Sequence, residues 1–201
     1  NMANLEAIRQ NNLRMTGLLT DRAADPQLPA VVWLSYNVHG NEASSSEVAM
    51  VLLHELLNEK NAEIRDWLKN VVVIIDPCLN PDGRERYIGW YNRMVGRHPN
   101  PDINSREHDE PWPGGRTNHY NFDLNRDWAW QTQIETRQRL LKYNEWMPQV
   151  HVDVHEQGPN NPYYFAPAAQ PYHRYLTQWQ RDFQVQIGKN NAKYFDQEGW
   201  L

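Results

Sequence analysis

Two short runs of β-branched and apolar residues place the strongest constraint on how this chain can fold. Val31–Tyr36 reads VVWLSY and Val71–Asp76 reads VVVIID, and neither run alternates strictly between apolar and polar residues. Such runs are typical of strands that helices cover on both faces of a parallel sheet. We therefore expect both strands to lie centrally in a sheet.

The segment between these runs has the period of a helix. Residues 42–58 carry apolar side chains three and four positions apart, which form one broad apolar face. A strand, a helix and a second strand in this order indicate a βαβ unit and an α/β fold. The residues of the apolar face are Val48, Ala49, Leu52, Leu53, Leu56 and Leu57.

Further elements continue the alternation of strand and helix. Thr132 and Glu135 have the spacing of a capping box, which predicts the start of another helix. This helix should lead into a third strand, Gln149–His155. Helical periodicity also predicts helices over Leu5–Leu13, Ala62–Lys69 and Pro171–Gly188.

Residues 77–130 lack clear periodicity and are rich in Pro, Gly, Asn and Asp. Loops of this length in compact domains are usually functional or disordered. Aromatic and arginine side chains are interleaved along this segment, which favours an ordered loop system that faces a substrate. Within it, Asn80-Pro81-Asp82-Gly83 is interpreted as a structural turn.

Length and charge exclude several classes of protein. With 201 residues and 23.8 kDa, the chain has the size of one domain. Its 20 Lys and Arg residues against 25 Asp and Glu residues leave no basic stripe, so nucleic acid is not an expected partner. No apolar stretch approaches the roughly 20 residues that a membrane-spanning helix needs. The single cysteine, Cys78, cannot form an internal disulfide and is expected in the core.

Three separate residues have the chemistry of a metal site. His39 and Glu42 follow the first strand, and His155 ends the third. The carboxyl ends of parallel strands meet at one edge of a sheet, where ligands bind. Two imidazoles and a carboxylate form the open ligand set of a catalytic zinc ion. A structural alternative is that Asn41 caps the following helix, that Glu42 interacts with its dipole, and that His155 is a core histidine.

The third strand contains two more polar residues on the face of His155, namely His151 and Asp153. The ends of a five-residue strand lie roughly 13 Å apart, too far for both histidines to hold one zinc ion. We therefore assign the metal to His155 and expect His151 and Asp153 to pack beside it or support it. The loop histidines His98, His108 and His119 are expected to be solvated.

Three further motifs accompany His39-x-x-Glu42 in a fixed order. They are Asn80-Pro81-Asp82-Gly83, then Asp123-Leu124-Asn125-Arg126, then Asp153-Val154-His155. With this ordered set, residues 31–167 resemble the zinc carboxypeptidases of the M14 family (carboxypeptidase A-like, or funnelins). Gly40-Asn41 and the Glu-Gln-Gly after His155 depart from the digestive enzymes, so the resemblance is to the wider family and leaves the preferred terminal residue open.

The resemblance implies a role for each residue of the motifs. One Zn²⁺ ion would be bound by His39, Glu42 and His155. Asp123 matches the carboxylate that orients the first histidine, a contact that fixes the imidazole tautomer. Asn125 and Arg126 match the pair that holds the terminal carboxylate of the substrate. Arg93 is the expected match for the arginine that stabilises the oxyanion, and Arg97 is close enough to compete.

The same resemblance implies the fold and the reaction. Residues 1–201 would be one domain, the amino-terminal two-thirds of an α/β three-layer sandwich around a mixed, mostly parallel sheet that is incomplete at its carboxyl end. Zinc would activate a water for hydrolysis of the C-terminal peptide bond of a peptide or protein. The family's general base, a glutamate on a later strand, is expected beyond Leu201, so little peptidase activity is expected from this stretch alone. Glu156 is not promoted to that role, because a neighbour of His155 on a strand should point to the other face.

Two other functions remain open from the sequence. One is an M14-like deacylase or amidase that acts on small N-acyl amino acids. The other is a catalytically inactive, zinc-containing module that binds peptides. Because members of the family tend to be exported, we also expect a secreted or periplasmic location.

Overall fold

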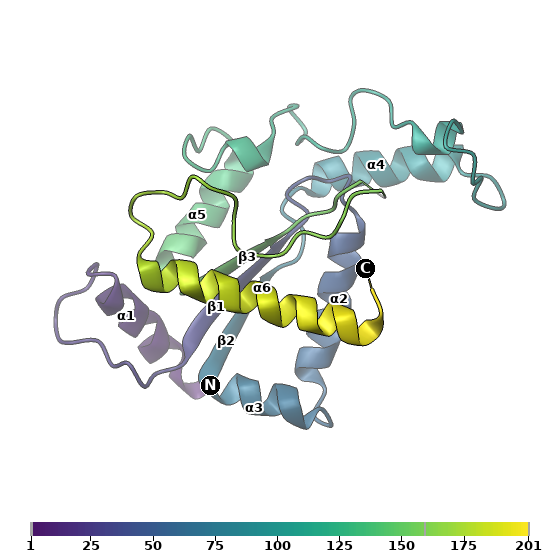
Figure 1. The fold of residues 1–201 in the computed structure, drawn as a ribbon. Helices are drawn as coiled ribbons and strands as arrows, with labels where there is room; N and C mark the ends of the chain where they lie inside the picture. Colours follow the sequence, from purple (N-terminus) through teal and green to yellow (C-terminus); the bar gives the residue numbers. More distant parts are fainter. Residues whose placement is uncertain (1, 159, 201) are drawn as a thin grey trace. The chain divides into compact units, whose positions relative to one another are not determined.

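The computed structural model describes residues 2–158 and 160–200 (Figure 1). This part of the chain divides into two compact units, one that ends at Glu156 and one that begins at Gln157. The expected strands and every expected site residue belong to the first unit. The description of the site therefore concerns that unit alone.

A parallel sheet of three strands forms the centre of the first unit (Figure 1). β1 (Ala30–Tyr36), β2 (Val71–Asp76) and β3 (Val150–Val154) confirm the predicted strands to within a residue or two at their ends. The order is β2-β1-β3, so within the described sheet only β1 is central. The expectation that β2 is also central was wrong, and its six residues are all partly exposed. An apolar run identifies a strand, but its position in the sheet depends on partners far away in the sequence.

The register of the sheet brings the carboxyl ends of the strands level with one another. Ser35 of β1 pairs with Asp76 of β2 and with Asp153 of β3. Two residues earlier on each strand, Trp33 of β1 pairs with His151 of β3. The loops that follow the strands therefore leave from one edge of the sheet, which is where an α/β fold places its ligands.

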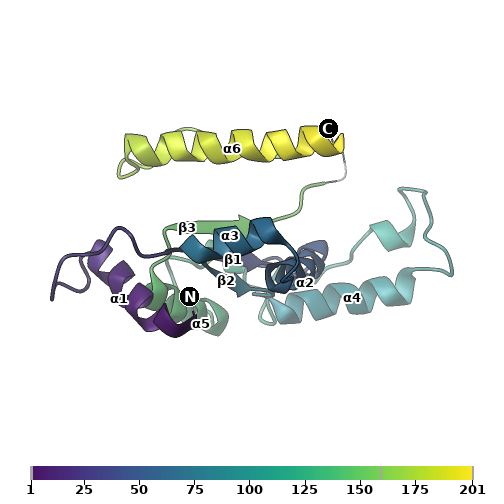
Figure 2. The same ribbon diagram turned by 90° about the horizontal axis from the view of Figure 1, so that it is seen from below.

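Helices pack against this sheet, and the core combines buried side chains of strands, helices and loops. In the first unit α1 and α5 lie side by side (Figures 1 and 2). The Tyr143 ring of α5 lies 5.5 Å from the Trp33 ring and 5.3 Å from the His151 ring, centroid to centroid, so α5 packs on this face of the sheet. None of the helices in residues 2–158 and 160–200 is long and apolar enough to span a membrane. The helices of this unit, apart from one described below, are α1 (Leu5–Met15), α2 (Ser44–Leu57), α3 (Ala62–Asn70) and α5 (Ile134–Trp146).

The predicted long loop contains a helix, α4 (Pro81–Met94), that the sequence analysis missed. The side chain of Asn80 accepts a hydrogen bond from the Gly83 backbone N–H at 2.9 Å and so caps this helix. Pro81 occupies its first position, where the missing N–H costs nothing. The four residues that we interpreted as a turn are thus a helix start. The rest of the loop contains two short 3-10 helices, η2 (Arg106–His108) and η3 (Leu124–Arg126).

The predicted capping box before α5 is not formed. The helix begins at Ile134 with Gln133 as its N-cap residue. The Thr132 hydroxyl instead donates to the Asp127 carboxylate at 2.7 Å. The Glu135 carboxylate accepts a hydrogen bond from the side chain of Asn118 at 3.2 Å. Thr132 and Glu135 have the residue types and the spacing of a capping box, but their side chains form hydrogen bonds with Asp127 and Asn118 instead.

The second unit contains the helix α6 (Gln178–Glu198), which starts and ends later than the predicted Pro171–Gly188. A capping box between Thr177 and Gln180 fixes its first residue. Gly188 does not end the helix but lies within it. A glycine is needed at this position because the carbonyl of Ala166 approaches the helix backbone too closely for any side chain.

Candidate metal centre

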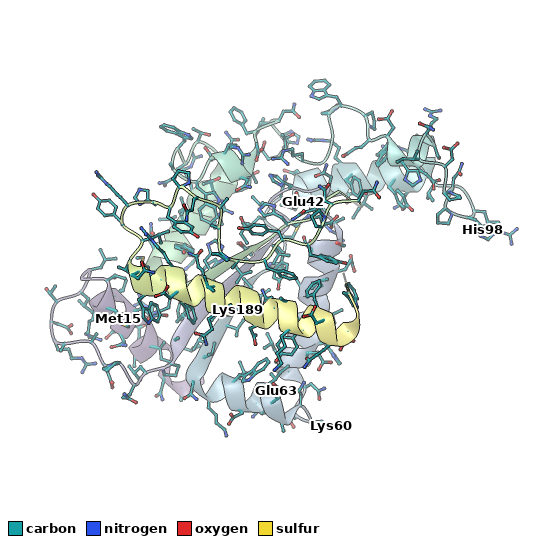
Figure 3. All side chains as sticks on the ribbon, in the orientation of Figure 1. Met15, Glu42, Lys60, Glu63, His98 and Lys189 are labelled. Carbon is teal, nitrogen blue, oxygen red and sulfur yellow. The ribbon has the colours of Figure 1, made fainter. Side chains whose placement is uncertain are left out.

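The structure brings His39, Glu42 and His155 together at the carboxyl edge of the sheet. Each of the three offers one donor atom within 4.8 Å of the others. Oε1 of Glu42 lies 2.7 Å from Nδ1 of His39, and Oε2 lies 3.0 Å from Nδ1 of His155. Figure 3 labels Glu42, which lies beyond the ends of the strands, near the start of α2. The separation of 116 positions between the two histidines is therefore no obstacle to a shared site.

These side chains differ in their access to solvent. The side chain of His39 is 4% exposed, that of Glu42 13% and that of His155 31%. The two imidazole rings lie 5.0 Å apart, centroid to centroid. The group is thus fixed on its inner side and open on the side of His155, which suits a centre that has to admit a substrate.

A buried asparagine that the sequence analysis did not single out shapes the loop of His39 and Glu42. Asn37 is fully buried and has a φ of 58°, a left-handed conformation that Asn adopts more readily than most residues. Its side-chain amide donates to the carbonyl oxygens of His39 at 2.7 Å, Gly40 at 3.3 Å and Glu42 at 3.0 Å. One side chain therefore holds the backbone of both ligand-bearing residues. An Asn directly after a buried strand was the available signal.

The same loop packs closely on the backbone of two other segments. A Cβ atom added to Gly40 would come within 2.2 Å of the Arg84 nitrogen and the Gly83 carbonyl carbon, and within 2.5 Å of the Gly115 oxygen. Since all three atoms belong to backbone, none can move aside cheaply. Glycine at this position lets the first turn of α4 support the loop.

The structural alternative for these residues was wrong. Asn41 does not cap α2, because its side chain donates to Glu110 at 2.9 Å. Glu42 precedes the helix, which begins at Ser44. Negative charge at the helix start comes from Glu47 in its first turn and from Glu156, whose carboxylate accepts hydrogen bonds from the backbone N–H and the hydroxyl of Ser44 at 2.7 and 2.5 Å. Glu156 is thereby directed at α2.

Asp123 lies behind His39, on the side away from Glu42. Its Oδ1 is 3.3 Å from Nε2 of His39, a contact without the angle of a good hydrogen bond. The same oxygen accepts from the backbone N–H of Asn125 at 2.9 Å, and Oδ2 accepts from Arg116 at 3.0 and 3.1 Å. Burial would raise the pKa of Asp123, but the charge of Arg116 and these hydrogen bonds hold it below its usual value. Asp123 is thus an anchored carboxylate facing the first histidine.

The arginine that the structure places beside the histidines is Arg116, which the sequence analysis listed among the loop residues without giving it a role. Its Nη1 lies 3.4 Å from Nδ1 of His39. Arg93 lies near the far end of α4, where it lines a hollow of about 390 Å³ with residues that include His119. Because Gly83 meets Gly40 and Arg93 comes ten positions later, Arg93 is about 15 Å farther along the helix axis.

Arg97 follows α4 and is exposed, still farther along the chain from the first turn of that helix. Neither Arg93 nor Arg97 is brought to the histidines as Arg116 is. Both were candidates because of their spacing from the Asn-Pro-Asp-Gly motif. The helix that starts at this motif, α4, leads the chain away from the ends of the strands (Figure 1).

Asn125 and Arg126 lie in η3, next to the metal group. The amide nitrogen of Asn125 is 3.5 Å from Nε2 of His155. Arg126 is exposed, and its Nη1 donates to the carbonyl of Asn125 at 3.2 Å. Asn125 thus lies beside His155, the more accessible of the two histidines, and Arg126 follows it in the chain with an exposed side chain.

The other histidines considered in the sequence, His98, His108, His119 and His151, do not join the group. Nε2 of His151 is 2.8 Å from the Ser35 hydroxyl, inside the unit, and burial lowers the pKa of His151. His98, His108 and His119 are exposed, and Figure 3 shows His98 at the tip of the loop after α4, well away from Glu42. Within residues 2–158 and 160–200, the group of His39, Glu42 and His155 is the set with the geometry of a metal site.

The charges of the group are strongly coupled. Burial would raise the pKa of Glu42, but hydrogen bonds with His155, His39 and the Glu156 N–H lower it to about 2. Hydrogen bonds to Asp153 and then to Glu42 raise the pKa of His155 to about 10. A concentration of negative charge thus surrounds the two imidazoles, and a dication would relieve it.

The donor set fits zinc. Two imidazole nitrogens and a carboxylate oxygen are the ligands of many catalytic zinc ions. Both histidines turn Nδ1 toward Glu42 and Nε2 toward a second carboxylate, Asp123 for His39 and Asp153 for His155. A carboxylate behind each imidazole is the arrangement that holds metal-binding histidines in the required tautomer.

The sequence of this chain is similar to those of known proteins. Residues 7–194 match the family model for M14 peptidases, described as zinc carboxypeptidase. A protein named zinc carboxypeptidase from Simulium vittatum is 39% identical over 74 residues, which cover 36% of this chain and 24% of that protein. Carboxypeptidase 2 of Trichophyton rubrum is 27% identical over 126 residues, or 62% of this chain and 18% of that protein. The matched stretch thus spans a quarter or less of either relative.

Proposed function

The chain belongs to the zinc carboxypeptidase family, and from this we propose that it acts as a metallocarboxypeptidase that removes residues from the carboxyl end of peptides or proteins. The observation that supports this most is the group of His39, Glu42 and His155, whose donor atoms lie within 4.8 Å of one another. The family's cofactor is zinc, and the group can hold one metal ion. The names of both matched relatives contain the word carboxypeptidase, which favours this function over deacylation of N-acyl amino acids or mere peptide binding.

In this proposal His39, Glu42 and His155 hold the ion. Bound zinc supplies a Lewis acid for the scissile carbonyl and lowers the pKa of a water molecule. Asp123 holds the imidazole of His39 from behind, and Asn37 holds the loop in place. The chain thus contributes a preformed ligand set, so little reorganisation is needed when the ion binds.

Three polar side chains at the open side would handle the substrate. Arg126 and Asn125 bind the terminal carboxylate, since a guanidinium can meet both carboxylate oxygens. Arg116, which lies beside His39, stabilises the negative charge that develops on the carbonyl oxygen. We assign this last role to Arg116 in place of Arg93, because Arg116 contacts the ligand set.

The proposal extends to the domain and its location. We propose that residues 1–201 form the first two-thirds of a single catalytic domain, a three-layer sandwich whose sheet is mixed and mostly parallel.

We also propose a secreted or periplasmic location, because members of the family are commonly secreted. Fractionation of cells that produce the natural protein would test the location, and recovery with the cytoplasmic fraction would contradict it.

The function is tested first by metal content and then by substrate choice. We expect one equivalent of zinc in the purified protein, measured by plasma mass spectrometry, and none in a His39→Ala, His155→Ala double variant. The zinc-loaded protein, in the length in which it is naturally produced, should hydrolyse N-blocked dipeptides with a free carboxylate. The matched C-terminal amides should resist. Equal hydrolysis of both, or activity confined to N-acyl amino acids, would refute a carboxypeptidase.

A further inference from the structure

Three polar side chains form a row across the carboxyl end of the sheet. Ser35 is in register with Asp76 on one side and Asp153 on the other, and residues in register on neighbouring strands project from the same face. Ser35 is fully buried, and its hydroxyl donates to Oδ1 of Asp153 at 3.1 Å. One oxygen of Asp153 is therefore engaged inside the sheet.

The other oxygen of Asp153 faces the metal group. Its Oδ2 lies 3.3 Å from Nε2 of His155, the ring nitrogen opposite the one that faces Glu42. The Asn125 amide nitrogen lies 3.5 Å from the same Nε2, but an amide N–H and an imidazole N–H are both donors. Asp153 is thus the acceptor that an Nε2–H of His155 meets.

A buried arginine lies near this row of side chains. Arg139 of α5 is 5% exposed, and its guanidinium lies 3.5 Å from the centre of the Trp128 ring. Among the described residues, its three guanidinium nitrogens have no hydrogen-bond partner. It interacts electrostatically with Asp153, Asp76 and Asp127. An uncompensated buried charge is costly, and these three carboxylates balance the charge of the guanidinium.

We infer that Asp153 is a positioning residue for His155: it accepts a hydrogen bond from Nε2 and so leaves Nδ1 deprotonated and aimed at the metal. Ser35 holds Oδ1 of Asp153 through its hydrogen bond and so fixes the rotamer that turns Oδ2 toward His155. The inference rests on the proposed function, since it takes His155 as a zinc ligand. It gives the second histidine a support that matches the one Asp123 gives the first.

The decisive variant is Asp153→Asn, which keeps the shape of the side chain. The Ser35 hydroxyl will hold the amide oxygen, and the amide N–H₂ will then face Nε2 of His155. Two donors cannot pair, so the imidazole is driven to the tautomer with its proton on Nδ1, where the metal binds. We expect the dissociation constant for zinc, measured by competition with a chromophoric chelator, to rise about 10- to 100-fold.

Two further measurements distinguish a positioning role of Asp153 from a contribution to the stability of the fold alone. The absorption bands of the Co²⁺-substituted protein should change in Asp153→Asn, because the ligand field at His155 changes. The downfield proton resonance of the His155 Nε2–H in the zinc-loaded protein should shift upfield or vanish. Asp76→Asn is the matched control, since it removes a partly buried carboxylate from the same row without touching His155, and it should keep the zinc affinity of the wild type.

The outcomes are distinct. Wild-type zinc affinity and an unchanged cobalt spectrum in Asp153→Asn would overturn the inference, and so would a loss confined to thermal stability. Failure of the wild-type chain to take up one equivalent of zinc would instead overturn the metal site itself, and this inference with it.

Discussion

At the scale of single residues, the contact of Gly40 with three backbone atoms determines where His39 and Glu42 lie. We expect Gly40→Ala to destabilise the protein by about 1–3 kcal/mol or more, because a methyl group is forced into packed backbone. Zinc affinity should fall with it. Urea denaturation and chelator competition measure the two effects. Gly96→Ala is the control, since its nearest neighbour, the His98 oxygen, lies at an ordinary 3.6 Å.

The assignment of the oxyanion-stabilising role to Arg116 and not to Arg93 also depends on single contacts. We expect Arg116→Ala to lower kcat about 10²- to 10³-fold, the usual effect of removing one oxyanion donor. Arg93→Ala should leave kcat within a factor of a few, because Arg93 lies about 15 Å farther along α4 than the turn that meets Gly40. Steady-state kinetics of the two variants on one blocked dipeptide compare them directly. A large loss in Arg93→Ala alone would restore the sequence-based choice.

At the scale of elements, the start of α5 depends on a carboxylate outside the helix. Asp127 is 4% exposed and accepts hydrogen bonds from the Thr132 hydroxyl and from the backbone N–H groups of Thr132 and Gln133. Burial would raise its pKa, but these hydrogen bonds lower it from 3.8 to about 2. The folded state therefore binds this proton less tightly than the unfolded state does.

A lowered pKa of this kind stabilises the fold above the unfolded value and stops doing so as the pH falls through the folded value. We expect Asp127 to contribute about 2 kcal/mol at neutral pH, lost between about pH 4 and pH 2. Asp127→Asn should lack this part of the acid sensitivity. Urea denaturation of both proteins at several pH values between 6 and 2 checks it, and parallel curves would exclude the role.

At the scale of the whole first unit, a metal ion held by His39, Glu42 and His155 would join the end of β1 to the end of β3 across more than half of the sequence. Zinc that binds only the folded state adds about 4 kcal/mol when its free concentration is a thousand times the dissociation constant. For a chain of this size we expect the melting temperature to rise by roughly 10 °C. Differential scanning fluorimetry with zinc or with EDTA measures this, and the shift should disappear in His155→Ala.

The sequence by itself determined the three parallel strands, the main helices of the first unit and the chemical identity of the ligand set. These follow from local periodicity and from residue types such as His39, Glu42 and His155, whose side-chain chemistry does not depend on the fold. The places where prediction failed have a common cause. Asn80-Pro81-Asp82-Gly83 suits a turn and a helix start equally well, and only the packing of Gly83 against Gly40 distinguishes them.

The tertiary structure alone decided which distant groups meet. Arg116 instead of Arg93 lies beside His39, Asn37 holds the ligand loop, and Glu156 caps α2, because the packing of helices and loops on the sheet selects one partner from many of the same type. Arg139 could not have been placed from its position in the chain. Hydrogen bonds and ion pairs act over a few ångströms in space, whereas sequence patterns report only neighbours along the chain.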